Sequence, residues 1–91
     1  MKRYSIDNAD QMKAVAPLMK RKEAVWNAHN AAVVWSTCER RGKPVPFKVY
    51  IDVGRNATLH RTVNGTPIYM GEMQLTATRN FVKSLKEVPL T

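Results

Sequence analysis

Residues 47–72 read FKVYIDVGRNATLHRTVNGTPIYMGE and contain three short runs with the pattern of β-strands. The first run alternates strictly between apolar and polar side chains, which is typical of a strand with one buried face. Between the second and third runs, Asn64-Gly65 is the strongest short signal for a two-residue β-hairpin. The segment therefore predicts a three-stranded antiparallel meander, with strands at 47–53, 57–63 and 66–72 joined by turns at 54–56 and 64–65.

The hairpin turn also predicts how the second and third strands pair. A two-residue loop at Asn64-Gly65 pairs Val63 with Thr66 and then Thr62 with Pro67, the second as a non-hydrogen-bonded pair. The missing N–H of Pro67 then points away from the second strand, which is tolerated only at the edge of a sheet. We therefore expect residues 66–72 to form an edge strand.

The same register divides the side chains between two faces of the sheet. The face expected to cover the core carries Phe47, Val49, Ile51, Val53, Leu59, Val63, Ile68 and Met70. The opposite face carries a row formed by Tyr50, His60 and Tyr69, with Lys48 and Thr62 beside it. Arg61 falls on the core face, so either its long side chain reaches the rim of the sheet or the register is shifted.

The N-terminal part of the chain, residues 1–41, is expected to be mainly helical after a short extended start at 1–6. Asp7 or Asn8 can cap a helix over about 8–16. Proline is tolerated at the first position of a helix but not in its interior. Pro17 therefore predicts a second helix over 17–41, and a single kinked helix is the alternative.

After the meander, Thr76 can cap a last helix over 76–88, which Pro89 ends. Its apolar stripe consists of Phe81, Val82, Leu85 and Val88. The sequence thus predicts one α+β domain over residues 1–91. It contains an N-terminal helix or helix pair, a three-stranded antiparallel meander and a C-terminal helix packed on one sheet face.

Residues 38–90 resemble a double-stranded-RNA-binding domain. Residues 38–47, CERRGKPVPF, are similar to the family's turn between its first helix and first strand, and 62–65 with Gly71-Glu72 are similar to its second hairpin. The resemblance implies the element order α-β-β-β-α. The family's lysine pair and its Gly-Pro-x-His loop, which contact RNA, are replaced here by Ala77-Thr78 and Gly54-Arg55-Asn56. The resemblance therefore implies the order of elements more than it implies RNA contacts.

The chain carries 15 Lys and Arg against seven Asp and Glu, a formal net charge of +8 on 91 residues. Such a balance favours an anionic partner, either nucleic acid or an acidic protein surface. A single cysteine, with no signal peptide and no membrane-spanning run, predicts a cytoplasmic, reducing location. We see neither metal-ligand spacing nor a nucleophile with a neighbouring base, and therefore expect no metal, no cofactor, no membrane contact and no enzymatic activity.

Our leading hypothesis is a small non-enzymatic protein that binds nucleic acid through its phosphates. The candidate cations are Arg40, Arg41, Lys43, Lys48, Arg55, Arg79 and Lys83. Clustered Lys and Arg supply affinity for the phosphate backbone, although the first three are also favoured by the dipole at a helix C-terminus. The row of Tyr50, His60 and Tyr69 is a candidate platform for stacking unpaired bases, or it simply stabilises the sheet as cross-strand pairs.

The alternative hypothesis is a protein-interaction module, such as an adaptor or a small inhibitor of phage or mobile-element origin that docks on a host protein. It rests on the second helix, which is apolar on more than one side. Trp26, Val33 and Trp35 are its candidate interface residues, because tryptophan is a frequent interface anchor. The same apolar surface predicts a homodimer built on this helix, unless the first helix folds back and covers it.

Overall fold

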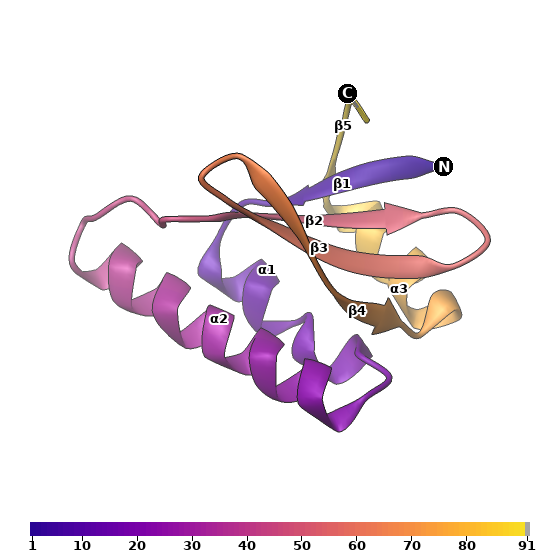
Figure 1. The fold of residues 1–91 in the computed structure, drawn as a ribbon, viewed down its shortest axis with the longest axis horizontal. Helices are drawn as coiled ribbons and strands as arrows, with labels where there is room; N and C mark the ends of the chain where they lie inside the picture. The colour runs from indigo at the N-terminus through magenta and orange to yellow at the C-terminus, as the bar shows by residue number, and fades with distance from the viewer. Residues whose placement is uncertain (91) are drawn as a thin grey trace.

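Two layers, a five-stranded antiparallel sheet and a set of helices on one of its faces, make up the computed structural model, which describes residues 1–90 (Figure 1). The predicted α+β class is confirmed, and the three-stranded description is incomplete. In chain order the elements are β1 (Lys2–Ile6), α1 (Ala9–Lys13), the 3-10 helix η1 (Ala16–Leu18), α2 (Lys22–Arg40), β2 (Lys48–Val53), β3 (Ala57–Val63), β4 (Thr66–Met73), α3 (Leu75–Phe81), the 3-10 helix η2 (Val82–Ser84) and β5 (Lys86–Val88).

The strands lie in the order β4-β3-β2-β1-β5, and all neighbours are antiparallel. The predicted meander is the β2-β3-β4 part of this sheet. Val63 pairs with Thr66 and Thr62 with Pro67, as the turn predicted. β4 is an edge strand, so the inference from Pro67 is confirmed.

Two strands that the sequence analysis did not place in the sheet extend it beyond β2, and the first of them, β1, is the extended start expected at residues 1–6. β1 pairs with β2 from Lys2 opposite Val53 to Ile6 opposite Val49. β5 then pairs with β1, with Arg3 opposite Val88. The prediction of a helix over 76–88 is therefore wrong in its second half. The chain leaves the helical conformation at Leu85, where φ is −103° and ψ is 159°, and Lys86–Val88 pair with the otherwise free edge of β1.

The start of α3 also differs from the prediction. The cap residue is Gln74, whose side chain makes no capping hydrogen bond, and the expected cap Thr76 lies inside the helix. Val82 and Leu85 of the predicted apolar stripe do reach the core. The stripe therefore marked the buried side of this segment correctly but not its secondary structure.

The first helix begins as expected. Asn8 is its cap, and the Oδ1 atom of Asn8 accepts a hydrogen bond from the backbone N–H of Gln11 at 2.8 Å. The Oε1 atom of Gln11 accepts in turn from the backbone N–H of Asp7 at 2.6 Å. The first bond satisfies an N–H group that a helix start leaves free, and the second ties the helix to the residue just before its cap.

The second helix begins later than the predicted residue 17. Pro17 lies in η1, and Met19 and Arg21 on either side of Lys20 have extended backbone angles. The backbone N–H of Lys20 donates to the carbonyl of Glu72 at 3.1 Å, and that of Gln74 donates to the carbonyl of Leu18 at 2.8 Å. Pairing with β4 thus replaces helical hydrogen bonding before α2 starts at Lys22.

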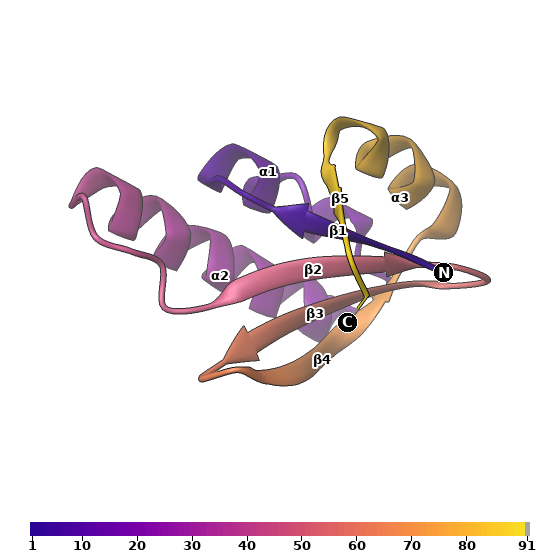
Figure 2. The ribbon, with the colours of Figure 1, turned by 90° about the horizontal axis from the view of Figure 1, so that it is seen from above.

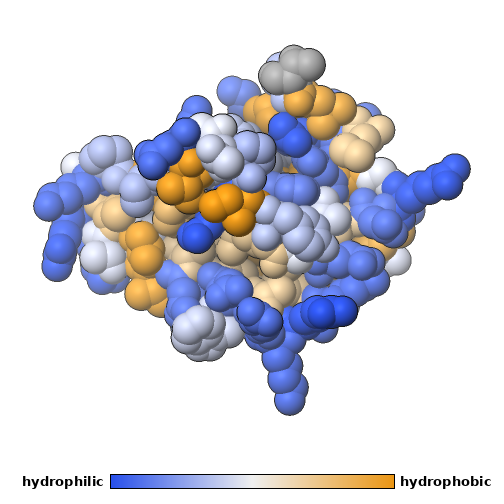
Figure 3. All heavy atoms as spheres, viewed as in Figure 1, coloured by the Kyte–Doolittle hydropathy of each residue, from blue (hydrophilic) through white to orange (hydrophobic). Residues whose placement is uncertain are grey.

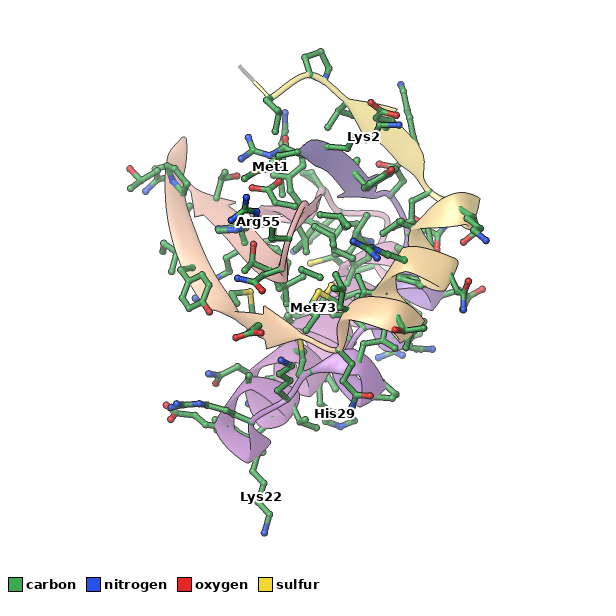
Figure 4. All side chains as sticks on the ribbon, turned by 90° about the vertical axis from the view of Figure 1, so that its right-hand side faces the viewer. Met1, Lys2, Lys22, His29, Arg55 and Met73 are labelled. Carbon is green, nitrogen blue, oxygen red and sulfur yellow. The ribbon has the colours of Figure 1, made fainter. Side chains whose placement is uncertain are left out.

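The core lies between the sheet and the helices. α2 turns a row of small side chains toward it, namely Ala24, Ala28, Ala31 and Ala32. Small side chains allow the helix to approach the sheet closely, and of its larger apolar residues Trp35 is also buried, whereas Trp26, Val33 and Val34 are exposed. Figure 4 shows Met73 of β4 in the interior between the two layers, whereas Lys22 points into solvent. Within residues 1–90 no helix is long and apolar enough to cross a membrane.

Candidate nucleic-acid interface

The face of the sheet opposite α2 is open and carries the aromatic row. Figure 2 looks onto this side, with α2 behind the strands. Tyr50 pairs with His60, and His60 pairs with Tyr69, so the three side chains cross β2, β3 and β4 in register as predicted. The rings of His60 and Tyr69 meet edge to face with centroids 5.7 Å apart. Tyr69 is 61% exposed, whereas Tyr50 and His60 are half-buried.

Residues of β1 and β5 continue this row across the sheet. Ser5 lies opposite both Tyr50 and Lys86. Arg3 lies opposite both Asp52 and Val88, and its guanidinium carbon is 5.5 Å from the centroid of the Tyr50 ring. Arg3 and Lys86 were missed by the sequence analysis, because only the placement of β1 beside β2 brings them to this face.

A partly buried ion pair lies beside Tyr50 on the same face of the sheet. The Nε atom of Arg3 donates to Oδ1 of Asp52 at 2.7 Å, and its Nη2 atom donates to Oδ2 at 2.9 Å. These hydrogen bonds lower the pKa of Asp52 below its ordinary value, although burial of the carboxylate acts in the opposite direction. Asp52 therefore holds Arg3 against Tyr50 as a fixed cation.

His60 is oriented by its neighbours on the same face. Its Nε2 atom lies 2.8 Å from the hydroxyl of Thr58 and 3.6 Å from Oδ2 of Asp52. The ring therefore has its polar edge turned toward Asp52 and one side against Tyr69. Because the ring is already held in place, stacking a base on it costs less side-chain conformational entropy than stacking a base on a mobile ring.

The open face is hollowed along its length. A cavity of 730 Å³ lies over β1, β2 and β3, with Tyr50 and His60 in its lining. Val88 and Pro89 border it on one side, and Gly65 and Pro67 of the hairpin border it on the other. Figures 1 and 2 show β5 rising on this side of the sheet. The Nη1 atom of Arg3 lies 3.4 Å from the carbonyl oxygen of Leu90, which anchors that end of the chain.

The seven predicted cations fall into two groups rather than one surface. Four lie where α2 ends and β2 begins: Arg40, Arg41, Lys43 and Lys48. The other three lie toward the opposite end of β2: Arg55, Arg79 and Lys83. Arg55 is in the β2–β3 turn, and Figure 4 shows it near Met1. The Nη2 atom of Arg79 donates to the carbonyl of Gly54 at 3.4 Å. Lys48 alone among the seven is on the open face itself, opposite Thr62.

The three predicted interface residues also separate. Trp26 is 65% exposed and Val33 is 52% exposed on the outer side of α2. Trp35 is only 6% exposed, and its Nε1 atom donates to Oε2 of Glu39 at 3.2 Å. Its ring packs edge to face on Phe47 with centroids 5.8 Å apart. Trp35 is therefore a core residue of this chain and is not available to a partner.

No family model, no curated protein and no solved structure matches this chain. The likeness to double-stranded-RNA-binding domains thus stays a prediction, and Thr78, at one of that family's lysine positions, is fully buried. Within the described residues no three His, Cys, Asp or Glu side chains gather as a metal site.

Proposed function

We propose that this protein binds single-stranded nucleic acid on the open face of its sheet. The observation that carries the proposal is the row of Tyr50, His60 and Tyr69 across three strands, beside a hollow and away from the helices. Aromatic rings on an open sheet accept unpaired bases of any sequence, at about 1–3 kcal/mol per stacked base.

The charges around the row support an anionic ligand. Lys48 on one side and Lys86 on β5 are exposed and form no ion pair within the described residues. Asp52, the acid nearest the row, is already neutralised by Arg3. Phosphates that follow a base stacked on Tyr50 or Tyr69 therefore meet these cations. A further carboxylate, Asp7, lines the hollow, and its Oδ1 atom accepts a hydrogen bond from the Ser5 hydroxyl at 2.7 Å. The net charge of +8 adds long-range attraction, which salt screens.

Fluorescence anisotropy with labelled single strands of about 12 nucleotides, as RNA and as DNA, tests the proposal. The same strands annealed to duplexes serve as competitors, and the titrations are run at about 50 and 200 mM salt. We expect saturable, salt-sensitive binding to single strands and weaker binding to duplexes. Absence of salt-sensitive binding to any single strand, or a preference for duplex, contradicts the proposal.

A matched pair of variants separates stacking from nonspecific attraction. Tyr69→Ala removes an exposed aromatic ring from the row, and we expect it to weaken binding about tenfold or more. Trp26→Ala removes an aromatic ring of similar exposure from the outer side of α2, and we expect no change in affinity. Equal effects of the two substitutions contradict a site on the open face.

A further inference from the structure

A second hollow, of 710 Å³, lies between α2 and β4, away from the centre of the open face. At Gly71 the two elements touch, since a Cβ atom there would lie 3.0 Å from the Cβ atom of Ala24. Figure 1 shows β4 and the hairpin diverging from α2 beyond this point. Figure 3 shows a weakly hydrophobic surface between them, bordered by hydrophilic side chains.

The outer edge of β4 already accepts a strand along part of its length. The segment Leu18–Lys20 pairs with it through the hydrogen bonds to Glu72 and Gln74 and an antiparallel bridge between Met19 and Met73. This pairing ends where the chain turns into α2 at Lys22. The remaining part of the edge, Thr66–Met70, has no neighbouring strand among residues 1–90.

The register shows which backbone groups of this free edge point outward. Val63 and Thr66 flank the two-residue turn as a hydrogen-bonded pair, and such pairs alternate along an antiparallel ladder. The backbone of Ile68 therefore also bonds to β3, whereas the backbone groups of Pro67 and Tyr69 point away from β3. The register shifts between Leu59 and His60, so one residue of β4 is skipped in the alternation there. Beyond the shift the carbonyl of Glu72 points outward, and it accepts a hydrogen bond from the backbone N–H of Lys20. The N–H and C=O of Tyr69 and the C=O of Pro67 are therefore free for an added strand.

The side chains of the groove define what that strand would carry. Val34 is 43% exposed and Ile68 is 40% exposed on its two walls, which favours apolar side chains between them. Apart from Arg61, the charges of the lining balance: Lys20 pairs with Glu72 at 2.7 Å, and Arg21 is matched in number by Glu23. Arg61 reaches the groove with its guanidinium carbon 5.9 Å from the centroid of the Phe47 ring, and it forms no ion pair within the described residues. An acidic side chain on the bound strand would supply the missing counter-charge.

We propose that the groove between α2 and β4 binds an extended segment of a partner protein, which adds to the free edge of β4 and carries apolar side chains and at least one acidic residue. This is β-strand addition beside a helix, in which backbone hydrogen bonds supply affinity and the groove supplies specificity. A second copy of this chain, adding through the same edge, would bring a proline and a register shift into both strands of the pair. It would therefore form fewer backbone hydrogen bonds than a partner strand that lacks proline.

Selection from a library of random peptides displayed on phage, with the full chain as bait, tests the proposal. Enriched peptides should contain an acidic residue among apolar ones. Val34→Glu and Arg61→Ala should each weaken their binding at least tenfold. Val33→Glu is the matched control. Val33 directly precedes Val34 in α2 but does not line the groove, so this substitution should leave peptide affinity unchanged.

Amide hydrogen exchange followed by NMR supplies a readout specific to strand addition. The amide of Tyr69 should exchange fast in the free protein and become protected when a selected peptide is added. The proposal is overturned if the wild-type chain enriches no peptides beyond those enriched with the Val34→Glu variant as bait. It is also overturned if a selected peptide binds but leaves the amide of Tyr69 unprotected. It is equally overturned if an oligonucleotide, or a rise in the concentration of the protein alone, produces the protection instead. Because Tyr69 lines this groove as well as the open face, the groove is tested with Val34→Glu and Arg61→Ala, and loss of oligonucleotide binding in Tyr69→Ala is read for the proposed function alone.

Discussion

At the scale of single residues, the ion pair of Arg3 and Asp52 makes stability depend on pH. The folded protein holds the pKa of Asp52 below the ordinary 3.8, because two hydrogen bonds from Arg3 stabilise the carboxylate. The resulting stabilisation is fully present above the pKa of the unfolded chain and is lost as pH falls through the lower pKa of the folded state. Asp52 therefore contributes at neutral pH and stops contributing in acid.

We expect Asp52→Asn to reduce the free energy of unfolding by about 2 kcal/mol at neutral pH, the size typical of charged hydrogen bonds in a partly buried site. Urea unfolding of wild type and variant at pH 7 and near pH 3 measures the difference. The gap between the two proteins should narrow in acid. A gap that is the same at both pH values would show that Asp52 acts through packing rather than through its charge.

Gly71 is the residue on which the contact between α2 and β4 depends. Its φ is +140°, and an added Cβ atom would lie 3.0 Å from Ala24 Cβ and 3.1 Å from Met19 Cε. Gly71→Ala should therefore cost about 2–3 kcal/mol from backbone strain and crowding together. Gly42→Ala, at φ +65° with no atom within 4 Å, isolates the backbone contribution and should cost about 1 kcal/mol. Denaturant unfolding of both variants checks this, and equal losses would contradict the crowding.

At the scale of elements, α2 separates its two tryptophans. Trp35 packs in the core and Trp26 lies on the outer side. Acrylamide quenching of Trp26→Phe, which keeps only Trp35, should be weak, and quenching of Trp35→Phe should be strong. Trp35→Ala should cost about 3–5 kcal/mol of stability, and Trp26→Ala less than about 0.5 kcal/mol. Strong protection of Trp26 from quencher would instead indicate that it is covered by a second copy, as in the homodimer expected from the sequence.

The elements that the sequence predicts correctly are those whose signals are local. The alternation in Lys48–Val53 and the turn at Asn64-Gly65 together fix the meander, its register and the row from Tyr50 to Tyr69. β1 and β5 carry no such signal, since they have five and three residues and are joined to the sheet only by distant partners. For the same reason Arg3 could not be assigned to the candidate site, although the aromatic residues could.

At the scale of the whole molecule, the positions of the two cation groups relative to the row predict which of them a bound strand meets. Lys48 is two residues from Tyr50 along β2, whereas Arg55 is five residues away, beyond the strand's end. At about 3.3 Å per residue these separations are roughly 7 Å and 16 Å. A short single strand stacked along the row therefore lies within reach of the first group and outside reach of the second.

We expect the double variant Lys43→Ala/Lys48→Ala to reduce the slope of log affinity against log salt by about 1.4, because two phosphate contacts are lost at about 0.7 each for single strands. Arg55→Ala/Arg79→Ala removes the same charge from the opposite end of β2 and should leave the slope for a short oligonucleotide nearly unchanged. The two variants have equal net charge, so their comparison cancels the long-range attraction of the whole molecule. Equal losses of slope in both would mean that binding reflects diffuse positive charge and that no strand follows the row on the open face.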